Sequence, residues 1–411
     1  MNHKLLAILV LFCAACSPKI KYSTTDFSSQ YKNLKIEPKF RSYASSHDSA
    51  VLLYQINKDG LLYKNNENGV FEASVILSYR VFANDHTSIV TDSGSVNLKI
   101  PFDSLNLIYD GILKYKICTC INYLRISVAD VNRNQEYIYG KAFDTRLTSG
   151  PSFYNVMDNF GEDLMSNVVS EGASVNVIPP AKEKLTVRCY FRDYPLAQPP
   201  FSNNPPQTFD LHSDSSFVIS ENESDGVGLN RKGLYYFQQD TLSNFGYTVF
   251  CADEDYPAFT AADQLIDALR YLTTKKEYDQ LINSDEKRKS IDQFWLEKAG
   301  NNERGRKLIR IYYGRAKDAN VHFTSYTEGW KTDRGMIYII FGPPATVYRD
   351  GDNEVWNYHF SEGIPASRFV FTRMNNPFTD NDYVLNRSAE LQRTWYIAVD
   401  SWREGRIAGD Y

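Results

Sequence analysis

The sequence predicts a multidomain, mainly β protein in which two immunoglobulin-like β-sandwich modules precede a helical segment and a small antiparallel sheet. Three observations support this fold class. A chain of 411 residues is long for a single hydrophobic core. Aromatic residues make up 14% of it, with 29 Tyr, and this composition favours strands. Short alternating apolar runs continue to residue 255, after which the apolar spacing becomes helical.

The overall charge excludes one class of partner. With 43% hydrophobic residues and a formal net charge of −5, the chain has the composition of an ordinary globular protein. It lacks the basic excess with which proteins bind nucleic acid. The same acidic balance argues against general adhesion to anionic lipid.

Residues 1–15 have the pattern of an export signal. Lys4 supplies a short basic region, residues 5–12 are apolar, and two alanines precede Cys16. The apolar run is too short to span a bilayer. The small-small-Cys ending is similar to a lipobox, in which the thiol of Cys16 is diacylglycerated and Cys16 becomes the new N-terminus. The alternative is a plain secretory signal that is cleaved nearby.

Lipidation of Cys16 would make the membrane a partner of the chain. Two or three acyl chains, palmitate among them, bury enough methylene groups for stable anchoring. Ser17 follows the cysteine, which resembles the pattern of lipoproteins sent to the outer membrane. We expect residues 16–45 to form a polar tether. The sequence leaves open whether the protein faces the periplasm or the outside.

Residues 46–150 are expected to form the first sandwich. Apolar or alternating runs predict its strands, and Asn-Asp, Asp-Ser-Gly and Asn-Arg-Asn turns separate them. This spacing is typical of an immunoglobulin-like sandwich, although the Cys-Trp-Cys core of a true immunoglobulin domain is missing. The predicted strands are 51–56, 69–82, 95–100 and 123–131.

A second strand-rich module is expected at residues 183–255, after a less regular bridge at 151–182. The proline-rich segment 194–206 interrupts it and is interpreted as a rigid surface connection. An acidic turn follows at 221–226. Because the module is small, we expect it to depend on its neighbours for stability.

Beyond Cys16 the chain has four cysteines: Cys118, Cys120, Cys189 and Cys251. An even number permits disulfides in an oxidising envelope, but the sequence does not determine the connectivity. Cys118 and Cys120 are two apart in a strand pattern, so we predict that they do not pair with each other. Cys189 with Cys251 is the favoured pair. No Cys/His spacing typical of zinc or haem occurs, so we expect no metal and no cofactor.

Residues 256–411 are expected to form an α+β domain. Thr260, Thr274, Ser284 and Asn301 are candidate helix caps, and apolar residues follow each of them at helical spacing. Next we predict a strand over Met336–Phe341 and a stop at 342–344. A hairpin (345–349 with 354–360) and a strand at 368–372 come after it. The closing amphipathic helix contains Leu391, Trp395, Val399 and Trp402.

The segment 326–344 contains the chain's most specific motif, Gly329-Trp330-Lys331-Thr332-Asp333. It resembles the GWxTD domain of predicted bacterial envelope proteins. The resemblance runs from about residue 262 to the end and includes Phe294-Trp295 and Trp356. It implies an envelope location. It implies no reaction, because the family has no settled catalytic residues.

Two interpretations of the motif differ in what Trp330 does. In the preferred one Gly329 permits a tight turn, Trp330 is buried, and Thr332 and Asp333 hydrogen-bond to nearby backbone groups. Arg334 would then pair with Asp333 or with the sheet edge, and the motif would join the helices to the sheet. In the alternative, Trp330 is a stacking platform for a sugar or peptide, with Asp333 and Arg334 as polar contacts. Catalysis is the third interpretation.

Candidate catalytic sets are sparse. His322 and His359 are the only histidines in the region of the resemblance, and neither has a metal-ligand spacing. Nucleophile-elbow, Walker and Rossmann motifs are missing. Residues 350–354 resemble the start of a calcium loop but lack its later ligands, so a turn is preferred.

The preferred function is a lipid-anchored, non-enzymatic scaffold or accessory subunit of an outer-membrane protein assembly or export complex. Its expected partners are outer-membrane proteins. The alternative is a lipoprotein that binds glycan or peptidoglycan, and an envelope hydrolase is third.

Overall fold

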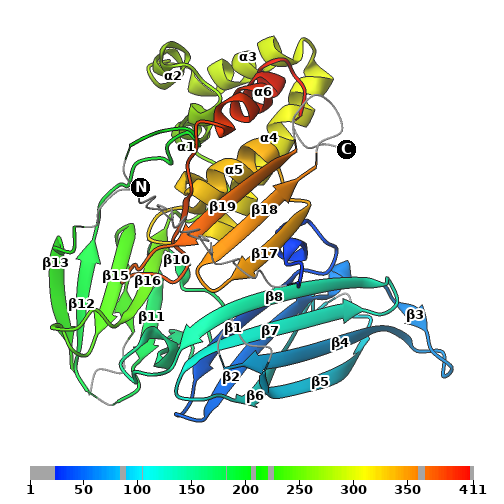
Figure 1. The fold of residues 1–411 in the computed structure, drawn as a ribbon, viewed down its shortest axis with the longest axis vertical. Helices are drawn as coiled ribbons and strands as arrows, with labels where there is room; N and C mark the ends of the chain where they lie inside the picture. Colours follow the sequence, from blue (N-terminus) through cyan, green and yellow to red (C-terminus); the bar gives the residue numbers. More distant parts are fainter. Residues whose placement is uncertain are drawn as a thin grey trace, which may run out of the picture.

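The computed structural model describes residues 24–83, 89–103, 105–181, 183–204, 210–220, 226–359 and 366–407. The predicted signal peptide and Cys16 lie outside the described residues. Three parts are visible in Figure 1: two β-sandwiches and, above them, a helical part with its own sheet. This is the predicted fold class.

The first sandwich packs two sheets face to face. Strand burial alternates strictly along β7, so its inward side chains, such as Ile126 and Val128, form the core with those of the facing sheet. Every strand predicted in this region is present. One sheet has the order β1 (Pro38–Ala44), β2 (Ser49–Asn57), β6 (Ile108–Lys116); the other contains β3 (Lys64–Asn65), β4 (Phe71–Phe82), β5 (Val90–Pro101), β7 (Ile121–Asp130) and β8 (Gln135–Asp144).

The second sandwich begins earlier than the sequence indicated. The segment expected as a bridge supplies three of its strands, β9 (Asn155–Asp158), β10 (Val168–Ser170) and β11 (Ser174–Ile178). The larger sheet has the order β10, β16 (Tyr247–Ala252), β15 (Gly233–Gln238), β12 (Leu185–Tyr190), β13 (Ser215–Ile219). The smaller has the order β14 (Val227–Gly228), β11, β9.

The predicted disulfide is wrong. Cys189 on β12 and Cys251 on β16 are both buried free thiols. Strand β15 lies between them, which separates their backbones by two strand spacings, about 9–10 Å. That exceeds the reach of a disulfide, about 7 Å between Cα atoms.

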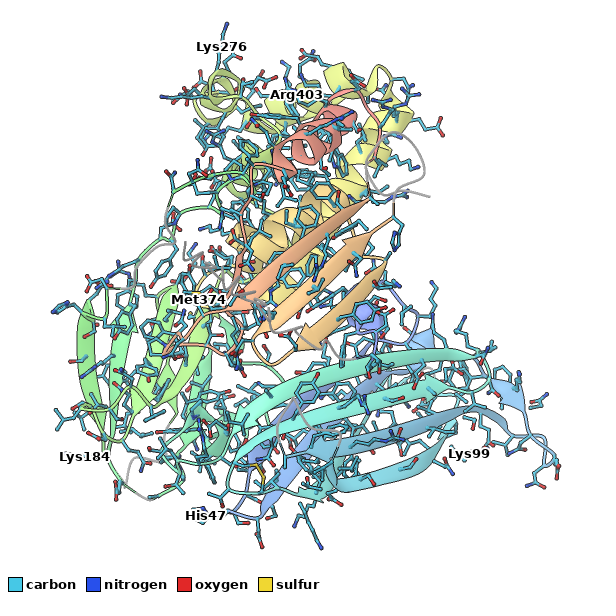
Figure 2. The ribbon with its side chains drawn as sticks, in the orientation of Figure 1. His47, Lys99, Lys184, Lys276, Met374 and Arg403 are labelled. Carbon is cyan, nitrogen blue, oxygen red and sulfur yellow. A yellow bond between two sulfur atoms is a disulfide. The ribbon has the colours of Figure 1, made fainter. Side chains whose placement is uncertain are left out.

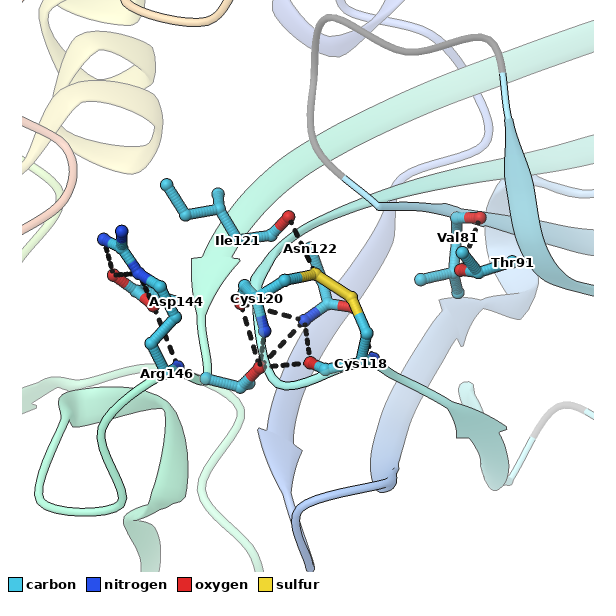
Figure 3. The surroundings of a disulfide bond; sticks show 9 residues. Val81, Thr91, Cys118, Cys120, Ile121, Asn122, Asp144 and Arg146 are labelled. Carbon is cyan, nitrogen blue, oxygen red and sulfur yellow. Dashed lines mark hydrogen bonds and ion pairs between the residues drawn. A yellow bond between two sulfur atoms is a disulfide. The ribbon is translucent and has the colours of Figure 1, made fainter.

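Cys118 and Cys120 form a disulfide instead (Figure 3), with their Cα atoms 5.3 Å apart. They lie between β6 and β7, not within a strand, so the argument from a shared strand face does not apply. Asn122 Nδ2 donates to the carbonyl oxygens of Cys118 (2.9 Å) and Cys120 (3.3 Å). The Thr145 hydroxyl donates to the Cys118 carbonyl at 2.6 Å. These bonds hold the turn that brings the two sulfurs together.

The helical part is close to its prediction. Thr274 forms a capping box with Glu277, and Asn301 caps the longest helix. Glu286, not Ser284, is the N-cap of α3, and Ala261, not Thr260, is that of α1. The helices are α1 (Ala262–Ala268), α2 (Lys275–Ile282), α3 (Lys287–Ala299), α4 (Asn302–Phe323), α5 (Asp333–Phe341) and α6 (Leu391–Arg403). Among the described residues, none of these helices has the length and apolar character needed to cross a bilayer.

The C-terminal sheet contains the predicted hairpin. Arg349 faces Glu354 across the turn between β17 (Thr346–Asp350) and β18 (Asn353–Tyr358). The sheet continues through β19 (Ser367–Arg373) to β20 (Tyr383–Leu385). Trp356, Phe369 and Phe371 are completely buried in the core shared with the helices.

The predicted strand Met336–Phe341 is a helix, α5, and this prediction is wrong. All nine residues of α5 are buried. A helix that is apolar on every side shows no amphipathic spacing, so its sequence looks like that of a buried strand. Thr332 caps its start, and Gly342, at φ 79°, ends it.

Residues 24–36, named here the strap, are part of the folded body. The strap contains the short 3₁₀ turn Ser28–Tyr31 and lies between β8 and β17. Phe27 and Tyr31 are each 1% exposed and belong to the core of the helical part. The segment expected as a polar tether therefore joins the first sandwich to the C-terminal sheet.

Candidate functional site

The two glycines of the motif region bring helices into direct backbone contact. A Cβ on Gly329 would lie 2.0 Å from the carbonyl oxygen of Ala319 in α4. A Cβ on Gly335 would lie 2.0 Å from the carbonyl oxygen of Gly329. Only glycine fits at either position, because a side chain on Gly329 would push the 3₁₀ turn Gly329–Lys331 away from α4, and one on Gly335 would push α5 away from that turn.

Trp330 is a core residue. It is 5% exposed, and its ring packs edge-on against Phe259 and Tyr271, with centroids 6.0 and 6.3 Å away. Its backbone N–H donates to Asn320 Oδ1 at 3.0 Å, and its carbonyl accepts from the Tyr271 hydroxyl at 2.9 Å. A ring enclosed in this way has no free face on which a sugar could stack.

Thr332 and Asp333 hold the start of α5. The Thr332 hydroxyl accepts from the Gly335 N–H at 3.1 Å. Asp333 accepts from two nitrogens of Arg387, at 2.5 and 3.0 Å, and from the Leu385 N–H at 2.7 Å. Burial raises the pKa of Asp333, although Arg387 and the Leu385 N–H oppose that rise. Arg387 lies 54 positions away, and nothing in the sequence near the motif indicated it.

Of the two partners predicted for Arg334, Asp333 or the sheet edge, the structure shows the sheet and not Asp333. Consecutive residues of a helix point about 100° apart, so the two side chains diverge. Arg334 faces Glu354 at 3.7 Å, donates to the Asn381 carbonyl at 2.9 Å and lies 4.1 Å from the ring centroid of Tyr383. It therefore points toward the C-terminal sheet.

Glu354 is the centre of a buried polar cluster that we name the junction network (Tyr31, Arg334, Arg349 and Glu354). Its carboxylate accepts from the Tyr31 hydroxyl at 2.8 Å, Trp356 Nε1 at 2.6 Å and Arg349 Nε at 2.9 Å. Burial alone would raise the pKa of Glu354. Arg349, Arg334 and these hydrogen bonds outweigh burial and hold that pKa below its usual range.

Arg349 connects the network to the first sandwich. It donates to the Tyr31 hydroxyl at 2.8 Å and to the carbonyl of Gly140 in β8 at 2.9 Å. The strap, α5, the C-terminal sheet and the first sandwich therefore meet at one buried ion cluster.

A cleft of about 1980 Å³ lies beside this cluster, bordered by all three parts of the molecule. We name it the central cleft. Half-buried tyrosines, among them Tyr139 of β8 and Tyr247 of β16, line it together with charged residues. Lys141 reaches across it to Asp380 at 3.2 Å. It therefore combines aromatic surface with many charged side chains.

The structure places the two candidate histidines apart. His322 lines the central cleft, and burial together with the charge of Arg334 lowers its pKa to about 4. His359 is exposed. Across the ranges that the structure describes, no three His, Cys, Asp or Glu side chains are grouped as a metal site requires.

Comparison with known proteins identifies the family of the motif. No curated protein matches the chain. The family model of the GWxTD domain matches residues 233–404, from β15 of the second sandwich to the end of α6. The match begins earlier than the resemblance around the motif indicated. The chain therefore carries a GWxTD domain at residues 233–404.

Proposed function

We propose that this protein is a lipid-anchored, non-enzymatic scaffold or accessory subunit of an outer-membrane protein assembly or export complex. The observation that carries the proposal is the use of the motif's polar groups. Thr332, Asp333 and Arg334 are all engaged in contacts within the chain, and these contacts hold the junction of the domains. Because these polar groups are used inside the chain, the motif favours a structural role over a catalytic one. A rigid body of this kind suits a scaffold, which presents surfaces to its partners.

The strap relates this body to the proposed anchor. Thr25, whose hydroxyl accepts from Arg125 of β7 at 2.6 Å, comes nine positions after Cys16. Nine residues span at most about 30 Å. A lipid on Cys16 would therefore hold the first sandwich close to the bilayer, within reach of integral outer-membrane proteins.

The test is purification of the tagged full chain from native membranes in a gentle detergent, followed by mass spectrometry. We expect integral outer-membrane proteins to co-purify. Cys16→Ser should release the chain into the soluble fraction and remove these partners. Recovery of the wild-type chain alone and monomeric would contradict the proposal.

The glycan-binding alternative can be separated from loss of folding at Trp330. Because the ring is buried, Trp330→Ala should destabilise the fold by about 3–5 kcal/mol. The melting temperature should fall sharply, while Phe160→Ala, at a ring 84% exposed, should leave it unchanged. An unchanged melting temperature together with lost pelleting on cell-wall polymer would favour the glycan alternative.

A further inference from the structure

Several strand edges border the central cleft, and two of them are already occupied. β8 is the outermost strand of its sheet, and its Ile138 N–H donates to the hydroxyl of Ser29 in the strap at 2.8 Å. β17 is outermost in the C-terminal sheet, and its Val347 carbonyl accepts from the Phe27 N–H at 2.9 Å. The strap therefore covers both edges.

β1 differs from these two strands. It is the outermost strand of the sheet β1-β2-β6, and its residues 38–42 line the central cleft. In the part of the chain that the structure describes, no strand pairs with its outer side. An open edge presents N–H and C=O groups in series, and the group that satisfies them in series is another extended backbone.

Three aromatic rings on β1 and β8 offer apolar contact to an added strand. The Phe40 ring of β1 lies 5.3 Å from that of Tyr139 and 6.3 Å from that of Tyr137, both on β8. All three side chains are half-buried and line the cleft. Since side chains of an added strand alternate in direction, every second one would meet these rings.

The cleft is positively charged although the chain is not. The whole sequence has a net charge of −5, whereas the cleft lining holds nine Lys and Arg against six Asp and Glu. Arg41 donates to the carbonyls of Val156 and Leu164, both at 2.7 Å, and has no carboxylate partner among the described residues. The field in the cleft therefore favours an acidic occupant.

We propose that the central cleft binds an extended, acidic segment of a partner protein, which pairs with β1 as an added strand. The partner's carboxylates would face the Lys and Arg side chains of the cleft, and its alternate apolar residues the rings of Phe40, Tyr137 and Tyr139. This inference rests on the proposed scaffold function and identifies how the scaffold holds its partner.

The experiment uses the purified full chain and a pool of capped decapeptides with Asp or Glu at alternate positions and apolar residues between them. A matched pool carries Lys in place of the acids. We expect retention of the acidic pool only, weakened by salt. Bound peptide should slow amide hydrogen exchange at β1.

A double variant tests the charge of the cleft. Lys39→Glu with Lys141→Gln should weaken binding of the acidic pool at least tenfold. The matched control is Lys184→Glu with Lys276→Gln, which makes the same charge change far from the cleft (Figure 2) and should leave binding unchanged.

Four results would overturn the inference: no retention, equal retention of both pools, protection at the exposed edge strand β13 instead of β1, or retention of acidic polysaccharide in place of peptide. If outer-membrane partners still co-purify from membranes while the acidic pool fails to bind, the scaffold proposal stands and only the cleft assignment is lost. If the acidic pool binds but no outer-membrane partner co-purifies, the cleft assignment stands and the scaffold proposal is lost.

Discussion

Glu354 sits where a carboxylate is costly unless it is paired, because it is 1% exposed inside the junction network. Its neighbours Arg349 and Arg334 are also largely removed from water. Desolvation of such charges costs several kcal/mol per ion, and their mutual attraction and hydrogen bonds offset it. Loss of one member therefore leaves the others uncompensated.

Glu354→Gln should lower the free energy of unfolding by about 3–5 kcal/mol, the range for breaking a buried ion pair from one side. Urea unfolding of the full chain measures it. Glu67→Gln, which removes the same charge at an exposed turn, should have an effect below about 0.5 kcal/mol. Equal small effects at the two positions would show that the network carries little stability.

His322 should titrate far below an ordinary histidine. Its pKa of about 4 in the folded chain compares with about 6.5 when unfolded. Between these values the unfolded chain binds more protons, so stability should fall as the pH drops from 6.5 toward 4. NMR titration of the imidazole measures the folded pKa.

The contribution of His322 to this pH dependence can be isolated. His322→Gln should flatten the slope of unfolding free energy between pH 6.5 and 4. His47→Gln, at an exposed histidine, should leave that slope as in the wild type. An imidazole midpoint near 6.5 would show that Arg334 and burial do not act on His322.

Part of the junction network follows from the sequence. Arg349 and Glu354 flank a hairpin turn that the sequence predicted, and the strands on either side place them opposite each other. Tyr31 and Asn381 could not be found in this way. They come from segments without regular spacing, and only the complete fold brings them to Arg334 and Glu354.

The sequence predicts a strand where the structure has helix α5, although it predicts the neighbouring helices correctly. α2 and α4 have caps and polar faces, so their local sequence and their burial indicate the same structure. α5 is buried on every side and contains three isoleucines, which also suit a strand. The predicted hydrogen bond between Thr332 and a nearby backbone group is present, but it caps a helix. Tertiary packing against α4 decides the outcome.

Two glycine substitutions in neighbouring helices should act in opposite directions. Gly335→Ala would place Cβ 2.0 Å from the Gly329 carbonyl oxygen, so it should destabilise α5 by several kcal/mol, measured as a loss in chemical unfolding. Gly314→Ala in α4 meets no atom within 4 Å. It should therefore stabilise by about 0.5–1 kcal/mol, the difference between Gly and Ala in a helix. A tolerated Gly335→Ala would contradict the close approach of α5 to the turn at Gly329.

The strap controls how the parts of the molecule are held together. Phe27→Ala removes a ring that is 1% exposed and lies 4.9 Å from Arg349. We expect a loss of about 3–5 kcal/mol and faster proteolysis between the first sandwich and the C-terminal sheet. Lys35→Ala, on the exposed side of the same segment, should change neither. Unchanged proteolysis in Phe27→Ala would mean that the parts hold together without the strap.

The position of the strap also determines the order in which the parts of the chain can fold. Tyr31 and Glu354 are 323 residues apart, so the first described segment to be synthesised meets its partner only after the two sandwiches and the helices have been made. Each sandwich can pair its own strands earlier, because those contacts are more local. A chain cut short before β18 would leave Phe27 and Tyr31 uncovered beside the proposed anchor. Docking of the strap is thus a late step that requires β18 to have been made.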